Sequence, residues 1–305
     1  MKNHIYKVFR LALKTGMCAG MLFCFFPGAL TAQDEEAPVA AETKKQVVKN
    51  TFESVWLIDN QTVMVPIKGT FEMDIQHRFG TVGNGYDDLW GIFAPSNIRL
   101  GFGYAPVSKL NLGFGVTKER LQWDFNVKYA LLQQMKGGGM PFSVTYFGNM
   151  VLDSRDKKFF ARGTDRLSYF HQLIIARKVT GKLSLQVAPS LSYYNNVEGY
   201  LDENGDIQKK MENAHFAVSF LGRYKVTESM AIMAGVDQPV TTHPTNNPYP
   251  NLCFGLEITT SSHAFQIFAS NYNGIVPQSN NVFNQNDYKN SGFLIGFNIS
   301  RLWNW

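Results

Sequence analysis

Apolar and polar residues alternate one by one over most of the chain after residue 70. In Thr70–Phe79, one set of alternate positions holds Phe, Met, Ile, His and Phe, and the other holds Thr, Glu, Asp, Gln and Arg. A period of two is typical of a β-strand with one apolar and one polar face. The pattern repeats in Asn97–Tyr104, Leu110–Val116 and Leu121–Leu131. These four stretches predict strands.

Further stretches continue the pattern, although less regularly. They are Phe142–Met150, Leu167–Arg177, Leu183–Tyr193, His215–Tyr224, Met230–Val236, Leu252–Ile258, Phe265–Tyr272 and Gly292–Trp305. Leu167–Arg177 has apolar residues in both registers, so the direction in which its faces point stays open. The pattern thus predicts about twelve strands, and an even number is the rule for single-chain bacterial barrels.

The connections between the predicted strands alternate in length. Short connections such as Ala105–Lys109 and Lys178–Lys182 follow even-numbered strands, whereas long ones such as Gly80–Ser96 and Asn273–Ser291 follow most odd-numbered strands. Membrane barrels have short turns at one mouth and long loops at the other. We therefore expect an all-β fold, a single closed antiparallel transmembrane β-barrel with its apolar faces toward lipid and its polar faces toward the lumen.

Aromatic residues gather near both ends of the predicted strands. Such residues are typical of the two membrane–water interfaces. At the mouth with short connections we expect Tyr104, Tyr129, Tyr224, Trp303 and Trp305. At the opposite rim we expect Phe79, Trp123, Tyr169, Tyr193 and Tyr272.

The first 32 residues have the organisation of a cleavable secretory signal peptide. Basic residues up to Lys14 precede an apolar run, Met17–Phe26, and a small-residue exit that ends at Ala32. The run is too short to cross a bilayer. The leader holds four of the 29 basic residues and none of the 24 acidic ones, so the remainder has a net charge of +1 rather than +5. A nucleic-acid partner is therefore not expected.

The predicted organisation has three parts: a signal peptide (1–32), a periplasmic N-terminal segment (33–66) and an outer-membrane β-barrel (67–305). Residues 33–49 are charged and rich in alanine, which is typical of a mobile tether. Residues 52–66 contain two short apolar stretches around Asp59, Asn60 and Gln61. This segment predicts either a small hairpin outside the barrel or a piece of chain folded into its lumen.

The candidate lumen residues are charged residues in the polar register of the strands. They are Glu72, Asp74, Arg78, Arg99, Asp124, Lys128, Asp237 and Glu257. One interpretation is a paired network that fills a polar interior, and the other is a constriction that selects small charged or polar solutes. Gly101, Gly103, Gly113 and Gly115 share this register, where they either leave open volume or relieve curvature.

The sequence contains no catalytic motif, and we expect neither an enzyme nor a cofactor. None of the six histidines has the spacing of a metal site. His171 and His215 lie near Ser168 and Ser219 in the predicted strands, which is a remote basis for a Ser/His lipid hydrolase of the outer membrane.

The block Thr51–Leu131, with its motifs IQHRFG and APSNIRLGFGYAP, resembles an uncharacterised family of Gram-negative outer-membrane β-barrels known only as a domain of unknown function. The later stretch RLSYFHQLIIARK fits the same family. The resemblance implies a barrel surrounded by outer-membrane lipid, and it implies no activity or site residues. A last strand that ends on an aromatic residue also resembles the segment read by the barrel assembly machinery, which makes Phe293–Trp305 the expected contact.

Three functions follow as hypotheses. The first is a passive channel or transporter for a small polar solute, and the second is a structural or interaction barrel that binds partners through its outer loops or N-terminal segment. Lipid hydrolysis is the remote third. The expected location is the outer membrane of a Gram-negative bacterium, reached after secretion through the inner membrane.

Overall fold

The computed structural model describes residues 46–290 and 292–304. The predicted signal peptide, most of the predicted tether and Trp305 lie outside the described residues. Among the residues described, no helix is long and apolar enough to cross a membrane.

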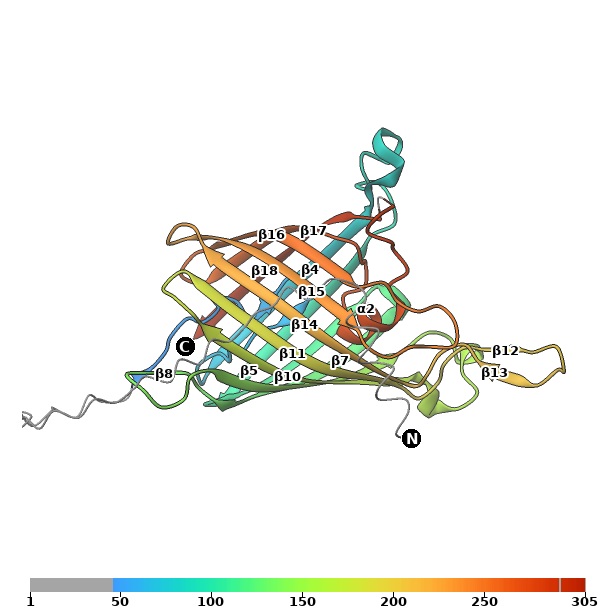
Figure 1. Cartoon of the computed structure of the whole chain (residues 1–305), viewed down its shortest axis with the longest axis horizontal. Helices are drawn as coiled ribbons and strands as arrows, with labels where there is room; N and C mark the ends of the chain where they lie inside the picture. Colours follow the sequence, from blue (N-terminus) through green and yellow to red (C-terminus); the bar gives the residue numbers. More distant parts are fainter. Residues whose placement is uncertain (1–45, 291, 305) are drawn as a thin grey trace, which may run out of the picture. The chain divides into compact units, whose positions relative to one another are not determined.

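The described residues form one closed antiparallel barrel of 12 strands (Figure 1). The strands are β4 (Thr70–Thr81), β5 (Asn97–Val107), β6 (Leu110–Thr117), β7 (Gln122–Leu132), β9 (Ser143–Asp153), β10 (Leu167–Lys178), β11 (Leu183–Tyr194), β14 (Ala214–Lys225), β15 (Met230–Pro239), β16 (Asn251–Thr259), β17 (His263–Ser270) and β18 (Leu294–Asn304). Each pairs with the next along the chain, and β18 pairs with β4 to close the sheet. Because the sheet is closed, the backbone N–H and C=O groups of every strand have hydrogen-bond partners, as a hydrocarbon environment requires. The predicted fold class is confirmed.

The two mouths of the barrel differ, as the connection lengths predict. We call the end at which β4 begins and β18 ends the terminal mouth. There, short β1 (Gln46–Val47) pairs with β8 (Met135–Lys136). The opposite end, the loop mouth, has the long connections. These contain the 3-10 turns η1 (Val82–Asp88), η3 (Lys157–Phe159) and η4 (Gly163–Arg166), and the hairpin β12 (Gly199–Leu201) and β13 (Ile207–Lys209). A further turn, η2 (Glu119–Leu121), precedes β7. The β12–β13 hairpin projects well beyond the barrel wall (Figure 1).

Outward-facing side chains are mostly apolar. Phe102 and Phe125 are 36% and 45% exposed, and both rings pack against Phe114 on this surface. At the terminal mouth, Tyr104, Tyr129 and Tyr224 are exposed. Trp303 packs against Phe71 with 5.6 Å between ring centroids.

Tyr272 contradicts the prediction for the outer rim. It is 1% exposed, and its hydroxyl donates a hydrogen bond to Asp59 in the barrel interior. The prediction was wrong because β17 ends at Ser270, after which the chain turns inward instead of continuing along the wall.

Two segments fill the lumen, one from each mouth. Residues 52–63, which we call the lumen hairpin, enter from the terminal mouth and contain β2 (Trp56–Leu57) paired with β3 (Asn60–Gln61). Helix α2 (Pro277–Phe283), from the connection between β17 and β18, lies within the barrel near the loop mouth and contacts β10, β11, β14 and β15 (Figure 1). Of the two positions left open for residues 52–66, the lumen is therefore the one observed.

A hydrophobic cluster inside the barrel joins the lumen hairpin to the wall. From the hairpin it contains Phe52, Leu57, Ile58 and Val63, and from the wall it contains Phe147, Phe170, Ile174, Ala176, Ala188, Leu221, Met233, Cys253 and Phe268.

Strand β10 shows why the sequence did not decide which of its two faces points into the barrel. Phe170 and Ile174 point inward and join the cluster, whereas Leu173 points outward and is 39% exposed. Both faces of this strand meet apolar surroundings.

Candidate functional site

The structure places all eight candidate lumen residues on the inner face of the barrel. They are almost completely buried: Arg78 0% exposed, Lys128 1%, Asp124 2%, Glu257 2%, Glu72 3%, Arg99 3%, Asp237 4% and Asp74 5%. Removing charges from water costs several kcal/mol per ion unless partners compensate. Most of these charges are indeed paired with one another or with the lumen hairpin, rather than arranged around an open passage.

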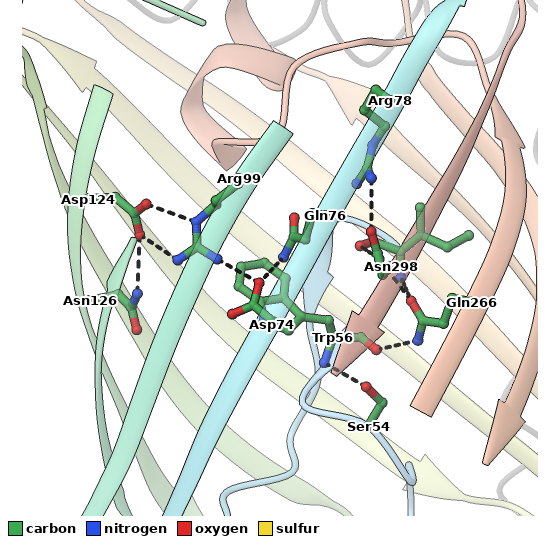
Figure 2. A network of polar contacts seen from close by, with 11 residues as sticks. Ser54, Trp56, Asp74, Gln76, Arg78, Arg99, Asp124, Asn126, Gln266 and Asn298 are labelled. Atoms are coloured by element: carbon green, nitrogen blue, oxygen red, sulfur yellow. Dashed lines mark hydrogen bonds and ion pairs between the residues drawn. The ribbon is translucent and has the colours of Figure 1, made fainter. Parts of the chain in front are cut away.

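Arg99 is the centre of the charged network between β4, β5 and β7. Its Nη1 lies 2.8 Å from Asp74 Oδ1, and its Nε and Nη2 lie 2.8 and 2.9 Å from the two carboxylate oxygens of Asp124 (Figure 2). Gln76 donates to Asp74, and Asn126 donates to Asp124. A two-pronged guanidinium–carboxylate pair of this kind fixes orientation as well as charge.

The inward-facing glycines make room for these polar side chains. A Cβ atom at Gly115 would overlap the Arg99 guanidinium, and one at Gly101 would overlap Asp74 and Arg99. A Cβ atom at Gly113 would overlap the Asn126 amide. Of the two alternatives for these glycines, open volume is therefore wrong at these three positions, because neighbouring side chains occupy it.

Of the five other candidate charges, four lie around the lumen hairpin, whereas Glu72 is buried and its Oε1 has no hydrogen-bond partner among the described residues. Lys128 Nζ donates to Gln61 Oε1 at 2.8 Å, and Asp237 accepts from the Asn60 amide at 3.0 Å. Arg78 donates to Asn298 at 2.9 Å. Glu257 pairs with Arg223, a buried residue absent from the predicted set. Arg223 falls in the inward register of its strand, so the alternation pattern alone could have identified it.

Polar side chains of the wall also bind the main chain of the lumen hairpin. The Gln266 amide donates to Trp56 O at 2.8 Å and accepts from Ile58 N at 3.0 Å, and Asn298 donates to Ile58 O at 2.5 Å (Figure 2). Gln186 donates to Gln61 O at 2.7 Å, and Thr145 donates to Val63 O at 3.1 Å. Lys128 donates to Val55 O at 3.3 Å. Buried main-chain groups need such partners, and here five wall strands supply them.

The tip of the lumen hairpin meets the segment that contains α2. Ile58 has φ +60°, which is a strained conformation for a β-branched residue. The next residue, Asp59, accepts hydrogen bonds from the Tyr272 hydroxyl at 2.6 Å and from the Asn280 amide at 3.2 Å. The two segments that fill the lumen are thus in direct contact at Asp59.

Helix α2 is held mainly by neutral side chains. The amides of Gln278 and Asn281 approach Ser168 and Ser190 on the wall at 3.4 and 3.5 Å, and Asn251 donates to Asn281 at 3.2 Å. These distances exceed or reach the upper end of the usual range for N–H···O bonds. The helix therefore fits its site less tightly than the hairpin does.

A histidine pair ties the neighbouring loop to the wall at the loop mouth. His243 lies 2.8 Å from His215, nitrogen to nitrogen, and accepts a hydrogen bond from Glu212 N on its other ring nitrogen. Since a ring nitrogen that accepts carries no proton, both rings are neutral in this arrangement. Burial lowers the pKa of His243, and the nearby Glu212 carboxylate acts in the opposite direction.

The structure does not assemble the Ser/His pairs considered for lipid hydrolysis. Ser168 points into the barrel and is 3% exposed, whereas His171 points outward and contacts the Tyr146 hydroxyl at 2.7 Å. His215 contacts His243 instead of a serine. Side chains three residues apart on a strand point to opposite faces, so the pairing hypothesis is wrong for Ser168 and His171.

A cavity of about 980 Å³ opens at the terminal mouth beside the lumen hairpin. Both ends of the hairpin segment line it, including Phe52 and Val63, together with Lys68, Lys109 and Trp303. The hairpin is therefore accessible from this mouth at the points where it enters and leaves the lumen.

Comparison with known protein families matches residues 52–303 to a model described as Membrane bound beta barrel domain (DUF5777). The resemblance seen in the sequence is thereby confirmed. No curated protein matches the chain significantly.

Several solved structures are similar to this chain at low sequence identity. The COG4313 outer membrane channel from Pseudomonas putida F1 is 12% identical with a TM-score of 0.47, covering 79% of this chain and 97% of its own. The NanC porin is 11% identical with a TM-score of 0.45, covering 76% and 98%. The KdgM porin is 12% identical with a TM-score of 0.42, covering 75% and 98%. Similarity this distant carries no information about what passes through or binds to this barrel.

Proposed function

The chain belongs to the Membrane bound beta barrel domain family (DUF5777), and we propose that it is a gated channel for small polar solutes in which the lumen hairpin is the gate. The barrel would lie in the outer membrane of a Gram-negative bacterium, with the terminal mouth toward the periplasm. The predicted leader and the apolar outer face support this location. Strand β18 and the C-terminal aromatic residue would be read by the barrel assembly machinery.

One observation carries the proposal: the lumen is filled by two segments that are not strands of the barrel wall, the lumen hairpin and helix α2. The lumen hairpin is covalently joined to the barrel wall only through residues 64–69, which lead into β4. Inside the barrel it is held by side-chain hydrogen bonds and by apolar contacts, all of which can be broken without unfolding a strand. The wall behind it carries charged and amide groups beside the apolar cluster, so its departure would expose groups that can bind polar solutes.

Planar-bilayer recordings of the full mature chain test this function. The double variant Gln266→Ala, Asn298→Ala removes three hydrogen bonds to the hairpin main chain. At about 1 kcal/mol per bond, we expect the ratio of open to closed states to rise about 100-fold. Gln208→Ala, which changes an exposed amide in β13, should behave like the wild type. A double variant that folds and never conducts would contradict the channel.

The second candidate function is an interaction barrel, and the loop between β4 and β5 favours it. Tyr86, Phe93 and Trp90 in this loop are 81%, 78% and 50% exposed. Clustered exposed aromatic side chains are typical of binding surfaces. If loosening the hairpin yields no current, this candidate becomes the better account, and Tyr86→Ser with Phe93→Ser should then abolish capture of the partner.

A further inference from the structure

The wall groups that hold the lumen hairpin bind its main chain more than its side chains. Gln266 uses both ends of its amide, one on Trp56 O and the other on Ile58 N. This is the pattern with which a neighbouring β-strand would bind the same residues. An ion offers no such alternation of carbonyl and N–H groups, and neither does a simple sugar.

The wall groups are oriented independently of the hairpin. The Asn298 amide also donates to Gln266 Oε1 at 3.0 Å and accepts from Arg78 at 2.9 Å. Gln266 in turn donates to Glu257 at 3.1 Å. Wall residues therefore fix one another, and a site that is preorganised in this way binds without the cost of ordering its own groups.

The hairpin adopts a conformation that its own sequence does not favour. A φ of +60° at Ile58 is a strained backbone conformation for a β-branched residue. The contacts of Ile58 N and O with Gln266 and Asn298 hold the residue in place. The wall thus imposes a shape on the peptide inside it, as a binding site does on a ligand.

Side-chain contacts around these main-chain bonds define which peptide sequences the site prefers. Leu57 and Ile58 enter the apolar cluster of the wall. The Trp56 ring lies 5.4 Å from the Arg99 guanidinium, within the range of a cation–π contact. Asn60 bonds to Asp237 and Gln172. The site therefore suits an aromatic or aliphatic stretch followed by a polar turn.

We propose that the lumen wall is a binding site for short peptides, and that the lumen hairpin is an internal occupant of this site. The inference rests on the proposed channel function and names its solute class. A peptide from outside the chain would compete with the hairpin for Gln266, Asn298, Gln186 and Thr145.

The test uses the full mature chain with Leu57→Ala, which weakens the internal occupant and leaves the wall intact. The probe is a fluorescent synthetic peptide with the sequence of residues 51–64, followed by fluorescence anisotropy. We expect saturable binding at least about tenfold tighter than to the wild type, in which the intact hairpin competes. Equal or absent binding in both proteins would overturn the inference.

Main-chain recognition has its own readout, in which only the probe changes. A second peptide carries an ester in place of the amide N–H at the residue equivalent to Ile58. The ester lacks the N–H that donates a hydrogen bond to Gln266 Oε1. We therefore expect the peptide to bind roughly 5- to 100-fold more weakly. Unchanged affinity would show that the site recognises only the side chains of the peptide, which would contradict the inference. Displacement of the peptide by a linear oligosaccharide of similar mass at similar concentration would also contradict the assigned class.

Bilayer recordings of the same Leu57→Ala chain separate the two proposals. Conduction without peptide binding would remove the peptide site and leave the channel. Peptide binding without conduction would remove the channel and leave the site. With both present, the peptide should block the current at concentrations near its dissociation constant.

Discussion

The lumen hairpin and helix α2 fill the same lumen but are held by different interactions. Three wall amides bond to the hairpin main chain at 2.5 to 3.0 Å, and four hairpin residues join the apolar cluster. The wall serines approach α2 amides at 3.4 and 3.5 Å, and among the buried residues of α2 only Val282 is apolar. The hairpin has buried apolar side chains and short hydrogen bonds, whereas α2 has few of either. We therefore expect the hairpin to be the more stable of the two closures and α2 to open before it.

The contrast also gives the two mouths different roles. Under the proposed gating, we expect α2 and its neighbouring loop to respond to conditions outside the loop mouth at small energetic cost. We expect the hairpin to respond only to an event that offsets several contacts at once, such as a competing ligand in the lumen. Asp59 connects the two closures through Tyr272 and Asn280, so movement of α2 removes part of what holds the hairpin tip.

Leu57→Ala should have the largest effect on this comparison. Leu57 is 1% exposed within the apolar cluster, and truncating a buried leucine costs about 2–5 kcal/mol. By hydrogen exchange with mass spectrometry, amide protection of residues 52–63 should fall roughly 30- to 4,000-fold while the barrel strands keep theirs. Ile67→Ala, in the adjoining link to β4 and at a residue 71% exposed, is the control. Equal loss of protection in the strands would show that the hairpin is part of the barrel fold rather than a separate closure.

Asn281→Ala should have a smaller effect, confined to the loop mouth. The change removes one weak bond to Ser190 and the acceptor for Asn251. A cost of about 0.5–1.5 kcal/mol should speed exchange in residues 277–283 roughly 2- to 12-fold, with a smaller change in residues 52–63, which are hydrogen-bonded to α2 through Asp59. A loss of amide protection as large as that caused by Leu57→Ala would contradict the conclusion that the hairpin is held more firmly than α2.

Lowering the pH should give the smallest effect, at the loop that His243 anchors. Its pKa is lowered by burial from a reference value of 6.5. A lowered pKa means that the neutral ring stabilises the closed loop above about pH 6.5 and that this contribution is lost as the pH falls further. From pH 7.5 to 5, exchange in residues 240–250 should rise a few-fold after correction for intrinsic rates, because a reference pKa of 6.5 limits the rise to about 30-fold even for a ring that never protonates in the closed loop. Replacing both rings of the pair, with His215→Asn and His243→Asn, should remove the pH dependence; if the dependence persists, a group outside the pair is responsible.

The outward half of the fold could be predicted from the sequence because lipid presents one uniform apolar environment. Strict alternation at residues such as Phe102 and Phe125 therefore identified the strands, their number and their outer faces. The family resemblance of the block Thr51–Leu131 added the same architecture and no chemistry.

The inward half was less predictable because its environment is set by other parts of the same chain. Arg99 occupies the space over Gly101 and Gly115, which the sequence alone could not distinguish from open volume. The helix α2 buries Gln278, Asn280 and Asn281, and hydrophobic patterns do not identify polar residues as buried. One signal was present: the two apolar registers of Leu167–Arg177 indicated an apolar partner within the lumen.

Cross-linking tests most directly whether residues 52–63 occupy the lumen. In a Cys253→Ser background, Asn60→Cys and Gln172→Cys replace two amide side chains whose polar atoms lie 3.3 Å apart, and a short bifunctional methanethiosulfonate linker spans the gap that the shorter cysteine side chains leave. Tyr200→Cys with Gln208→Cys, directly paired in the exposed β12–β13 hairpin, controls for reaction with the linker. The account predicts a peptide linking residues 60 and 172 by mass spectrometry, and a closed channel until the disulfides to the linker are reduced. A control that links fully while residues 60 and 172 stay unlinked in the folded barrel would contradict it.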